Sequence, residues 1–484
     1  MGDVRARWYG NTLVIGADDR LPGHLVTALP RERGRHTVLL AGDEPIAPEL
    51  VDEVIRTELQ DPTSIRLASA GGRTGAVAQR LADRAGIEVV APAGPTMLVA
   101  PGALFVAARS GPGAWRIHRP GVRATKVLDM PRHPAPPWRT PLPGRPGRRP
   151  GGLSARLLPA GYWVTRARWA SVARDDPAFA IEIDDEKAVV LVGQPDRRPP
   201  SARRLYRWLS QLPESTLSQL TLMPYGPWDA LLDEVAAHVS TELHVTVRRT
   251  AGLPVRVRDA TCYVPVNRDG GIGARSAAQT MSYVANDPAP RVESWISPLT
   301  QHVETGSPVV EVDGRWILEV VRSGYWLREA GAAAPDEVRL RPTVVGGNEF
   351  VVSTSGAESL DLAHRLAERL PADVRSSLRF AQITTAASPS SSSQGAGRQV
   401  PVVPPAPPTR TAPATPAVPA AAVRPSLPVV EPLLAPHPPV APTEQPVLSA
   451  PAPIGRTEHV SAPSTTAEAT TSSATDHDRT KDHL

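Results

Sequence analysis

The chain has 484 residues with a formal net charge of +4, and 41% of its residues are hydrophobic. This length is sufficient for two or three domains. The small net charge argues against nucleic acid as a partner, because nucleic-acid binders concentrate basic charge on one face. The single cysteine, Cys262, excludes an intramolecular disulfide and a cysteine-based zinc cluster.

Targeting signals are not visible in the sequence. The N-terminal residues lack the apolar core of a secretory signal, and no window approaches the apolar length of a membrane span. We therefore expect a protein without a membrane span that is cytoplasmic by default. Export by a non-classical route remains an alternative.

The first predicted unit, residues 1–130, alternates strands and helices. Strands are predicted at 36–40, 65–68 and 87–90, helices at 49–59 and 76–83, and a β-rich extension at 97–107. The apolar residues of the first helix recur at helical spacing. This alternation predicts parallel strands joined by right-handed crossovers, and hence a sheet covered on both faces.

A basic, proline-rich stretch at 131–152 predicts a spacer of polyproline II type. The second unit, residues 153–322, then repeats the first. Its predicted strands are 188–192, 220–223 and 243–247, its helices 202–212 and 230–236, and its β-rich extension 255–266. Two units with the same order of elements predict tandem copies of one fold.

A third unit, residues 323–386, is incomplete. It repeats the Gly161-Tyr162-Trp163 motif of the second unit as Gly324-Tyr325-Trp326, followed by a strand at 350–352, a helix at 362–370 and a second strand at 378–381. Because it stops after its second strand, we expect it to pack on the second copy. Residues 387–484 consist mainly of Ser, Pro, Ala, Thr and Val, a composition that predicts a disordered tail.

Four segments of the first unit resemble a known family. They are 65–71, 77–83, 89–92 and 115–121. Together they resemble the caspase-like α/β unit of large actinobacterial repeat proteins, which often carry polymorphic-toxin effector domains such as ADP-ribosyltransferases. The resemblance implies tandem caspase-like or flavodoxin-like three-layer units with mainly parallel sheets. It also implies a scaffold or carrier role towards an unknown protein partner, with the C-terminal effector domain missing from this chain.

Active members of that family carry a His-Gly after one strand and a Cys after the next, which places a base beside a nucleophile. The matching positions are Ala41-Gly42 and Ala70 in the first copy, about Val192-Gly193 and Tyr225 in the second, and about Thr354 or Ser355 and Gln382 or Ile383 in the third. None is a Cys or a His. The sequence therefore predicts a non-catalytic protein with no catalytic, cofactor-binding or metal-binding residue.

Two enzymatic alternatives remain open. Ser69 precedes the missing cysteine and is the candidate nucleophile of a diverged hydrolase, although a serine needs an oriented base and none is visible. The loop Gly71–Gly75 joins a strand to a helix and is a candidate nucleotide site. It lacks both the Lys-Ser/Thr pair of a P-loop and the dinucleotide fingerprint.

Overall fold

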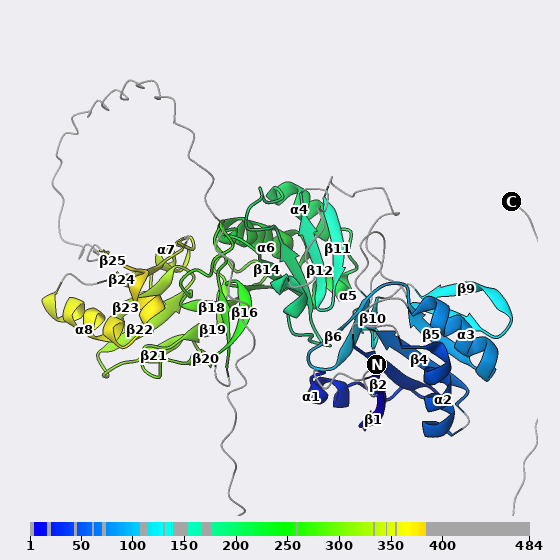
Figure 1. Ribbon diagram of the computed structural model, residues 1–484. Coiled ribbons are helices and arrows are strands. Elements are labelled where there is room, and N and C mark those ends of the chain that lie inside the picture. The colour runs from blue at the N-terminus through cyan, green and yellow to red at the C-terminus, as the bar shows by residue number, and fades with distance from the viewer. Residues whose placement is uncertain are drawn as a thin grey trace, which may run out of the picture. The chain divides into compact units, whose positions relative to one another are not determined.

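The computed structural model of the chain describes residues 4–16, 21–42, 46–60, 62–69, 74–106, 115–128, 131–136, 138, 153–166, 176–257, 260–332, 334–344, 346–353 and 356–383 (Figure 1). The predicted tail at 387–484 and most of the predicted spacer lie outside these residues. Within them the chain is a mixed α/β protein whose larger sheets contain parallel strands.

The first copy is built on a mixed sheet in which β1 to β5, β8 and β9 follow one another in chain order. Its strands are β1 (Arg5–Tyr9), β2 (Thr12–Gly16), β3 (His36–Ala41), β4 (Ser64–Ser69), β5 (Glu88–Pro92), β8 (Trp115–Arg119) and β9 (Val122–Leu128). Strands β3 to β5 are parallel, as expected, and β2, which was not predicted, is also parallel to them. Strands β1 and β8 flank them in antiparallel orientation.

Both faces of this sheet are covered. Helices α2 (Pro48–Glu58) and α3 (Gly75–Ala85) pack on one face, where Val51, Ile55 and Leu81 meet alternate residues of the strands. The other face is covered by α1 (Gly23–Thr27) and by the hairpin β6 (Thr96–Val99) and β7 (Ala103–Val106). The second face is therefore covered mainly by a β-hairpin, and long helices cover only the first face of the sheet.

The second copy repeats this arrangement on a sheet that runs in the order β11 to β15, β18, β19 and β20. Its strands are β11 (Ser154–Leu158), β12 (Gly161–Thr165), β13 (Ala188–Val192), β14 (Leu220–Pro224), β15 (Val247–Thr250), β18 (Ala278–Tyr283), β19 (Arg291–Ile296) and β20 (Val303–Thr305), with the hairpin β16 (Leu253–Val257) and β17 (Ala260–Val264). Its helices are the 3-10 helix η2 (Pro177–Ala180), α4 (Ala202–Leu209), α5 (Glu214–Leu217) and α6 (Asp229–Leu243). Helix α6 continues through Leu243, where a strand was expected, and ends at His244 in the left-handed conformation, so β15 begins only at Val247.

The third copy consists of β21 (Val309–Glu311), β22 (Trp316–Val321), β23 (Gly324–Glu329), β24 (Asn348–Val352) and β25 (Leu378–Gln382), with α7 (Asp336–Arg339), α8 (Ala357–Glu368) and α9 (Ala372–Ser376). Its sheet already includes β21 and β22, which precede residue 323. Strands β23 to β25 are parallel and correspond to β2 to β4 of the first copy. As expected, the third copy packs on the second: Trp316, Tyr325 and Phe350 share one apolar core with side chains of the second copy.

The repeated glycine at the start of β12 and β23 has a steric explanation. Gly161 and Gly324 occupy equivalent positions in their hairpins. A Cβ atom at either position would lie 2.0 Å from a backbone oxygen of the next strand, that of Val189 or Glu349. Only glycine lets the two backbones approach this closely.

The beginning of the predicted spacer is part of the fold. Residues Arg132–His133 form β10, which pairs with β7, and Trp138 is buried against Tyr162 in the core of the second copy. The hairpin residues Ala103 and Phe105 also pack on the second copy, while Leu104 packs on the first. Residues 131–136 and 138 therefore do not form a free spacer. Because this stretch is rich in proline, its sequence did not indicate the short strand β10 or the buried indole of Trp138.

Candidate functional site

The carboxyl ends of the parallel strands carry the positions that would match the His and Cys of the resembled caspase-like family. Strand pairing gives the equivalent positions, starting from the partners of the first residues of β2, β12 and β23, which are Thr37, Val189 and Glu349. Counting along the strands from these residues aligns Ala41 with Gly193 and with Ser353. The residues that the sequence matched to Ala41 were Val192 in the second copy and Thr354 or Ser355 in the third. They lie one or two residues from the structurally equivalent positions.

In the first copy the position of the family's histidine is part of the core. Ala41 ends β3, is 5% exposed and packs with the residues that cover this face of the sheet. Ser69 ends β4 and is half-buried beside Leu40 in register. Ala70 and residues 71–73 lie outside the described residues. The methyl group of Ala41 is therefore part of the packing at this end of β3.

Helix α3 begins directly after the candidate phosphate loop. Thr74, the last loop residue before the helix, is 1% exposed, and its hydroxyl donates a hydrogen bond to the carbonyl oxygen of Pro92 at 3.3 Å. In a P-loop the corresponding hydroxyl would face the metal and phosphate. The Thr74 hydroxyl is instead committed to the neighbouring strand, which argues against that use of the loop.

In the second copy aromatic side chains fill the strand ends. The indole nitrogen of Trp163 donates to the carbonyl oxygen of Gly193 at 2.8 Å, and that of Trp228 donates to the carbonyl oxygen of Tyr225 at 3.2 Å. A Cβ atom at Gly193 would lie 2.5 Å from the Trp228 indole nitrogen. The space that a catalytic side chain would need is therefore occupied by the indole ring of Trp228.

Tyr225 is the residue of this copy that the resemblance matches to the family's cysteine. Its hydroxyl donates to Oδ1 of Asp176 at 3.0 Å, and its ring lies 5.4 Å from that of Trp163. Burial and the neighbouring Asp176 carboxylate raise the pKa of Tyr225 above its usual value. The phenol is therefore neutral at physiological pH and acts as a packed hydrogen-bond donor.

The third copy has similar packing at the end of its corresponding strand. Ser353, the counterpart of Ala41, is 6% exposed, and its hydroxyl accepts a hydrogen bond from the indole nitrogen of Trp326. Trp326 is equivalent to Trp163, so both indoles reach the residue directly after the end of the next strand. Thr354 and Ser355 lie outside the described residues.

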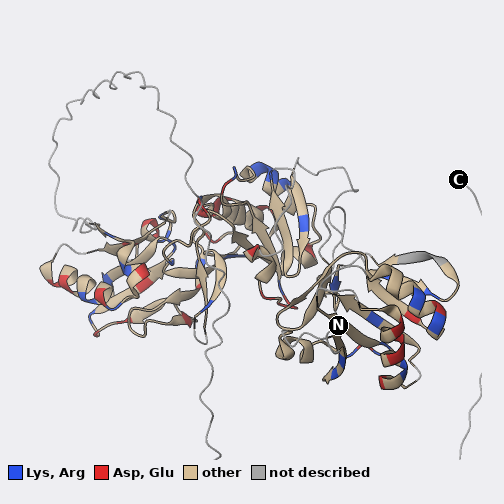
Figure 2. Ribbon diagram, viewed as in Figure 1, with Lys and Arg blue, Asp and Glu red and all other residues tan. Residues whose placement is uncertain are grey.

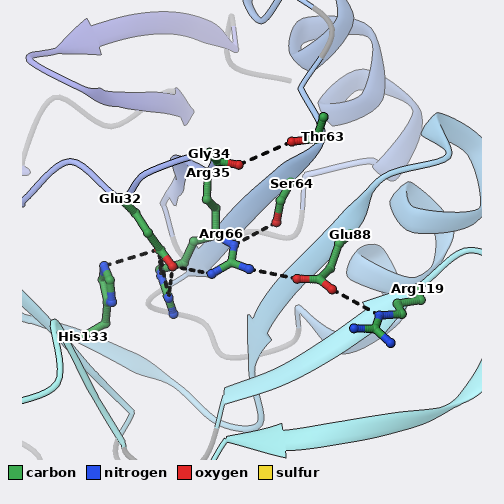
Figure 3. Close-up of polar contacts among 9 residues, drawn as sticks. All are labelled: Glu32, Gly34, Arg35, Thr63, Ser64, Arg66, Glu88, Arg119 and His133. Atoms are coloured by element: carbon green, nitrogen blue, oxygen red, sulfur yellow. Dashed lines mark hydrogen bonds and ion pairs between the residues drawn. The ribbon is translucent and has the colours of Figure 1, made fainter. Parts of the chain in front are cut away.

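A cluster of charged side chains lies at the opposite, amino ends of the strands in the first copy (Figure 3). Arg66, on β4, is 4% exposed, and its guanidinium donates to both carboxylate oxygens of Glu32 at 3.0 and 3.1 Å. The guanidinium also lies 4.7 Å from the ring centroid of Trp115. This bidentate pair fixes the segment before β3 against the sheet.

The cluster extends across the sheet through further ion pairs (Figure 3). Arg35 contacts Glu32 and donates to Glu88 at 2.8 Å, and Arg119 donates to the other oxygen of Glu88 at 3.1 Å. Burial raises the pKa of Glu32, but Arg66 and Arg35 outweigh this effect, so its pKa is lowered overall. The Glu32 carboxylate is therefore an ionised structural partner and is not a proton donor near neutral pH.

His133, from β10, faces the same cluster, with Nε2 3.6 Å from a carboxylate oxygen of Glu32. Burial, together with the nearby Arg66 and Arg35, lowers the pKa of His133 to about 4, although Glu32 opposes the shift. The imidazole is therefore neutral at pH 7. It lies at the amino ends of the strands, whereas Ser69 lies at a carboxyl end, so the two do not form a dyad.

A second buried cluster surrounds Arg249 on β15. Its side chain is fully buried and forms ion pairs with Asp229 at 3.0 Å and Asp233 at 2.7 Å, both on α6. Asp233 also accepts hydrogen bonds from the hydroxyls of Tyr283 and Thr343. Burial raises the pKa of Asp229, and Arg249 opposes this rise. Thr343 precedes β24, so the cluster joins the second copy to the third.

Sequence reasoning missed both clusters, although a signal was present. Arg66 is a charged residue inside a predicted apolar strand, a pattern that requires a buried partner. Arg249 lies just beyond the strand predicted at 243–247, so the signal there was weaker. Cys262 lies in the β-rich extension predicted at 255–266 and is 3% exposed on β17. No sequence pattern indicated that Nη1 of Arg275 would lie 3.7 Å from the Cys262 sulfur.

No group of three or more potential ligands that could hold a metal ion occurs among the described residues. Within the same residues, every helix is too short or too polar to cross a membrane. Basic and acidic side chains are interspersed over the copies, and the exposed arginines of α4, Arg203, Arg204 and Arg207, form a small basic patch (Figure 2). Comparison of the chain with protein-family models, with curated proteins and with solved structures found no match.

Proposed function

We propose that the chain is a non-catalytic interaction scaffold. The observation that carries this proposal is that core side chains and indole rings occupy the strand ends where a dyad would stand. At Gly193 the Trp228 indole leaves no space for a side chain of any size. The resemblance to caspase-like units supports the same role, with the copies acting as a carrier or docking region for a protein partner.

The packing of the copies on one another is also consistent with a scaffold. The hairpin of the first copy is buried partly by the second, and the second and third copies share one core. Partly exposed ion pairs such as Arg275–Asp373, with a closest distance of 2.7 Å, add directional contacts between the second and third copies. Copies joined in this way present their surfaces at fixed spacing, as repeat proteins do when they bind partners.

The alternatives are a serine hydrolase that uses Ser69 and a nucleotide-binding protein that uses the loop 71–75. Both are tested directly on the full-length chain. We expect no covalent labelling by a fluorophosphonate probe, with Ser69→Ala as the matched variant, and no change in melting temperature with Mg-ATP or Mg-GTP. Labelling that is lost in Ser69→Ala, or a saturable nucleotide-dependent shift, would refute the proposal.

We further propose that the scaffold acts in the cytoplasm, with non-classical export as the alternative. Fractionation of the native host distinguishes the two locations. Intact protein that accumulates in the culture supernatant, without release of a cytoplasmic marker, would favour the carrier role in export.

A further inference from the structure

Strand β25 is an exposed edge where the other two copies have a buried strand. The strand registers align Phe380 of β25 with Leu67 of β4 and Leu222 of β14. Leu67 and Leu222 are 0% exposed, whereas Phe380 is 40% exposed. A position that belongs to the core in two copies is therefore uncovered in the third, within the described residues.

The complete copies show what covers this position. In the first copy, α3 packs over Leu67 and β5 pairs in parallel with β4. In the second copy, α6 packs over Leu222 and β15 pairs in parallel with β14. The same two elements, a helix followed by a parallel strand, thus complete the sheet in both copies.

The described part of the third copy has neither of these elements. Beyond β25, no strand of the described residues continues the sheet, as Figure 1 shows for the margin of the third copy. On the covered side, β25 pairs with β24, and the ring of His364 on α8 lies 4.3 Å from that of Phe380. The exposed site consists of the outer edge of β25 and the uncovered part of the Phe380 ring.

The backbone at this edge can accept a strand. The amide of Ile383 donates to the carbonyl oxygen of Val352 on β24 at 2.9 Å. Because peptide groups alternate in direction along a strand, the amides of Phe380 and Gln382 point to the open edge. Strand addition to such an edge supplies main-chain hydrogen bonds and pockets for alternate side chains.

We propose that the third copy binds, in trans, a helix–strand segment of a partner protein. The partner's strand pairs in parallel with β25, and its amphipathic helix covers Phe380. Self-pairing of β25 between two chains is a poorer match, because a two-fold axis makes the two strands antiparallel, whereas both complete copies accept a parallel strand here. This inference rests on the proposed scaffold function and names the surface through which the scaffold acts.

The probes are two labelled peptides taken from the complete copies: residues 74–95, which contain α3 and β5, and residues 226–252, which contain α6 and β15. Fluorescence anisotropy with the full-length chain measures their binding. We expect saturable binding of at least one peptide. Phe380→Asp removes the apolar contact and Gln382→Pro removes an outward amide, and each should weaken binding by about tenfold or more.

Val309→Asp is the matched control, because Val309 is 38% exposed on β21, the opposite edge strand of the same sheet. This variant should bind the peptides like the unaltered chain. Hydrogen exchange provides a second readout: the amides of Phe380 and Gln382 should exchange rapidly in the free chain and slowly in the complex.

Three results would overturn the inference. They are failure of both peptides to bind, equal weakening by Val309→Asp, and protection of the β25 amides in the free chain, which would mean that the chain covers this edge by itself or by dimerisation. None of these results bears on labelling of Ser69 or on nucleotide binding. The proposed non-catalytic role is therefore tested separately.

Discussion

Arg249 is a fully buried cation whose charge is balanced by two carboxylates of α6. Replacement by methionine preserves much of the volume but leaves Asp229 and Asp233 buried without a counter-charge. Removing one partner of a buried ion pair typically costs about 3–5 kcal/mol. We expect Arg249→Met to lower the free energy of unfolding by this amount, measured by urea titration at pH 7.

The neighbouring Arg248 provides the control. It lies on the same strand, but its side chain is 38% exposed, and it pairs with Glu293 at 3.3 Å. Exposed ion pairs contribute about 0–1 kcal/mol. A loss in Arg248→Met equal to that in Arg249→Met would show that burial does not determine the effect.

His133 makes the stability of the first copy sensitive to acid. Its pKa is about 4 in the fold, below the ordinary value of 6.5, so the unfolded chain binds a proton first as the pH falls. The contribution is fully present above pH 6.5 and is lost as the pH falls towards 4. At pH 5 the protonation of His133 lowers the free energy of unfolding by about 2 kcal/mol relative to its value above pH 6.5. We expect urea unfolding to show this loss between pH 7 and pH 5.

The variant His133→Gln cannot titrate and is the comparison for this prediction. Its free energy of unfolding should change less than that of the unaltered chain over the same interval. Glu32, Arg35 and Arg66 also face the imidazole. The lowered pKa of Glu32 places its own acid sensitivity below its ordinary value of 4.5, outside this interval. If the free energies of unfolding of the unaltered chain and of His133→Gln change equally with pH, His133 is not the source of the acid sensitivity.

At the scale of the element, the close pairing of β23 with β24 requires a glycine at position 324. Gly324 has a φ of +149° and lies so close to Glu349 that a Cβ atom would be 2.0 Å from its carbonyl oxygen. Gly324→Ala should therefore destabilise the third copy by about 2 kcal/mol or more. Thermal unfolding monitored by tryptophan fluorescence measures this change.

Gly356→Ser is the control in the same copy. Gly356 is the N-cap of α8, no atom lies within 4 Å of an added Cβ, and serine is a good capping residue. Its melting temperature should be unchanged or raised. A loss similar to that of Gly324→Ala would mean that any glycine replacement in this copy is harmful, whatever its contacts.

Elements with a strong local pattern were predictable from the sequence. Helices α2 and α3 and strands β3 to β5 lie close to their expected positions, because their apolar periodicity and their final packing agree. The short strand β10 was not predictable, because its pairing with β7 is a long-range contact inside a proline-rich stretch. The strand-end positions were located to within about a residue or two, and only strand pairing corrected them.

At the scale of the whole molecule, the second and third copies are not independently packed domains. Their sheets contribute to one apolar core, and Asn348 of the third copy accepts a hydrogen bond from the amide of Ala277 at 2.6 Å. The core that α2 and α3 form with the sheet of the first copy contains residues of that copy alone. The second and third copies should therefore unfold as one cooperative unit. The core formed by α2 and α3 in the first copy should unfold separately from them.

Phe350→Ala tests this coupling. Phe350 is 0% exposed in the shared core, and a phenylalanine-to-alanine change in a core costs about 3–5 kcal/mol. We expect native-state hydrogen exchange to show reduced protection not only in β24 but also in β13 and β14 of the second copy, because a shared core opens as one unit. Strand β3 of the first copy should keep its protection. Loss confined to β24 and its neighbours in the third copy would show that the copies unfold separately despite their common core.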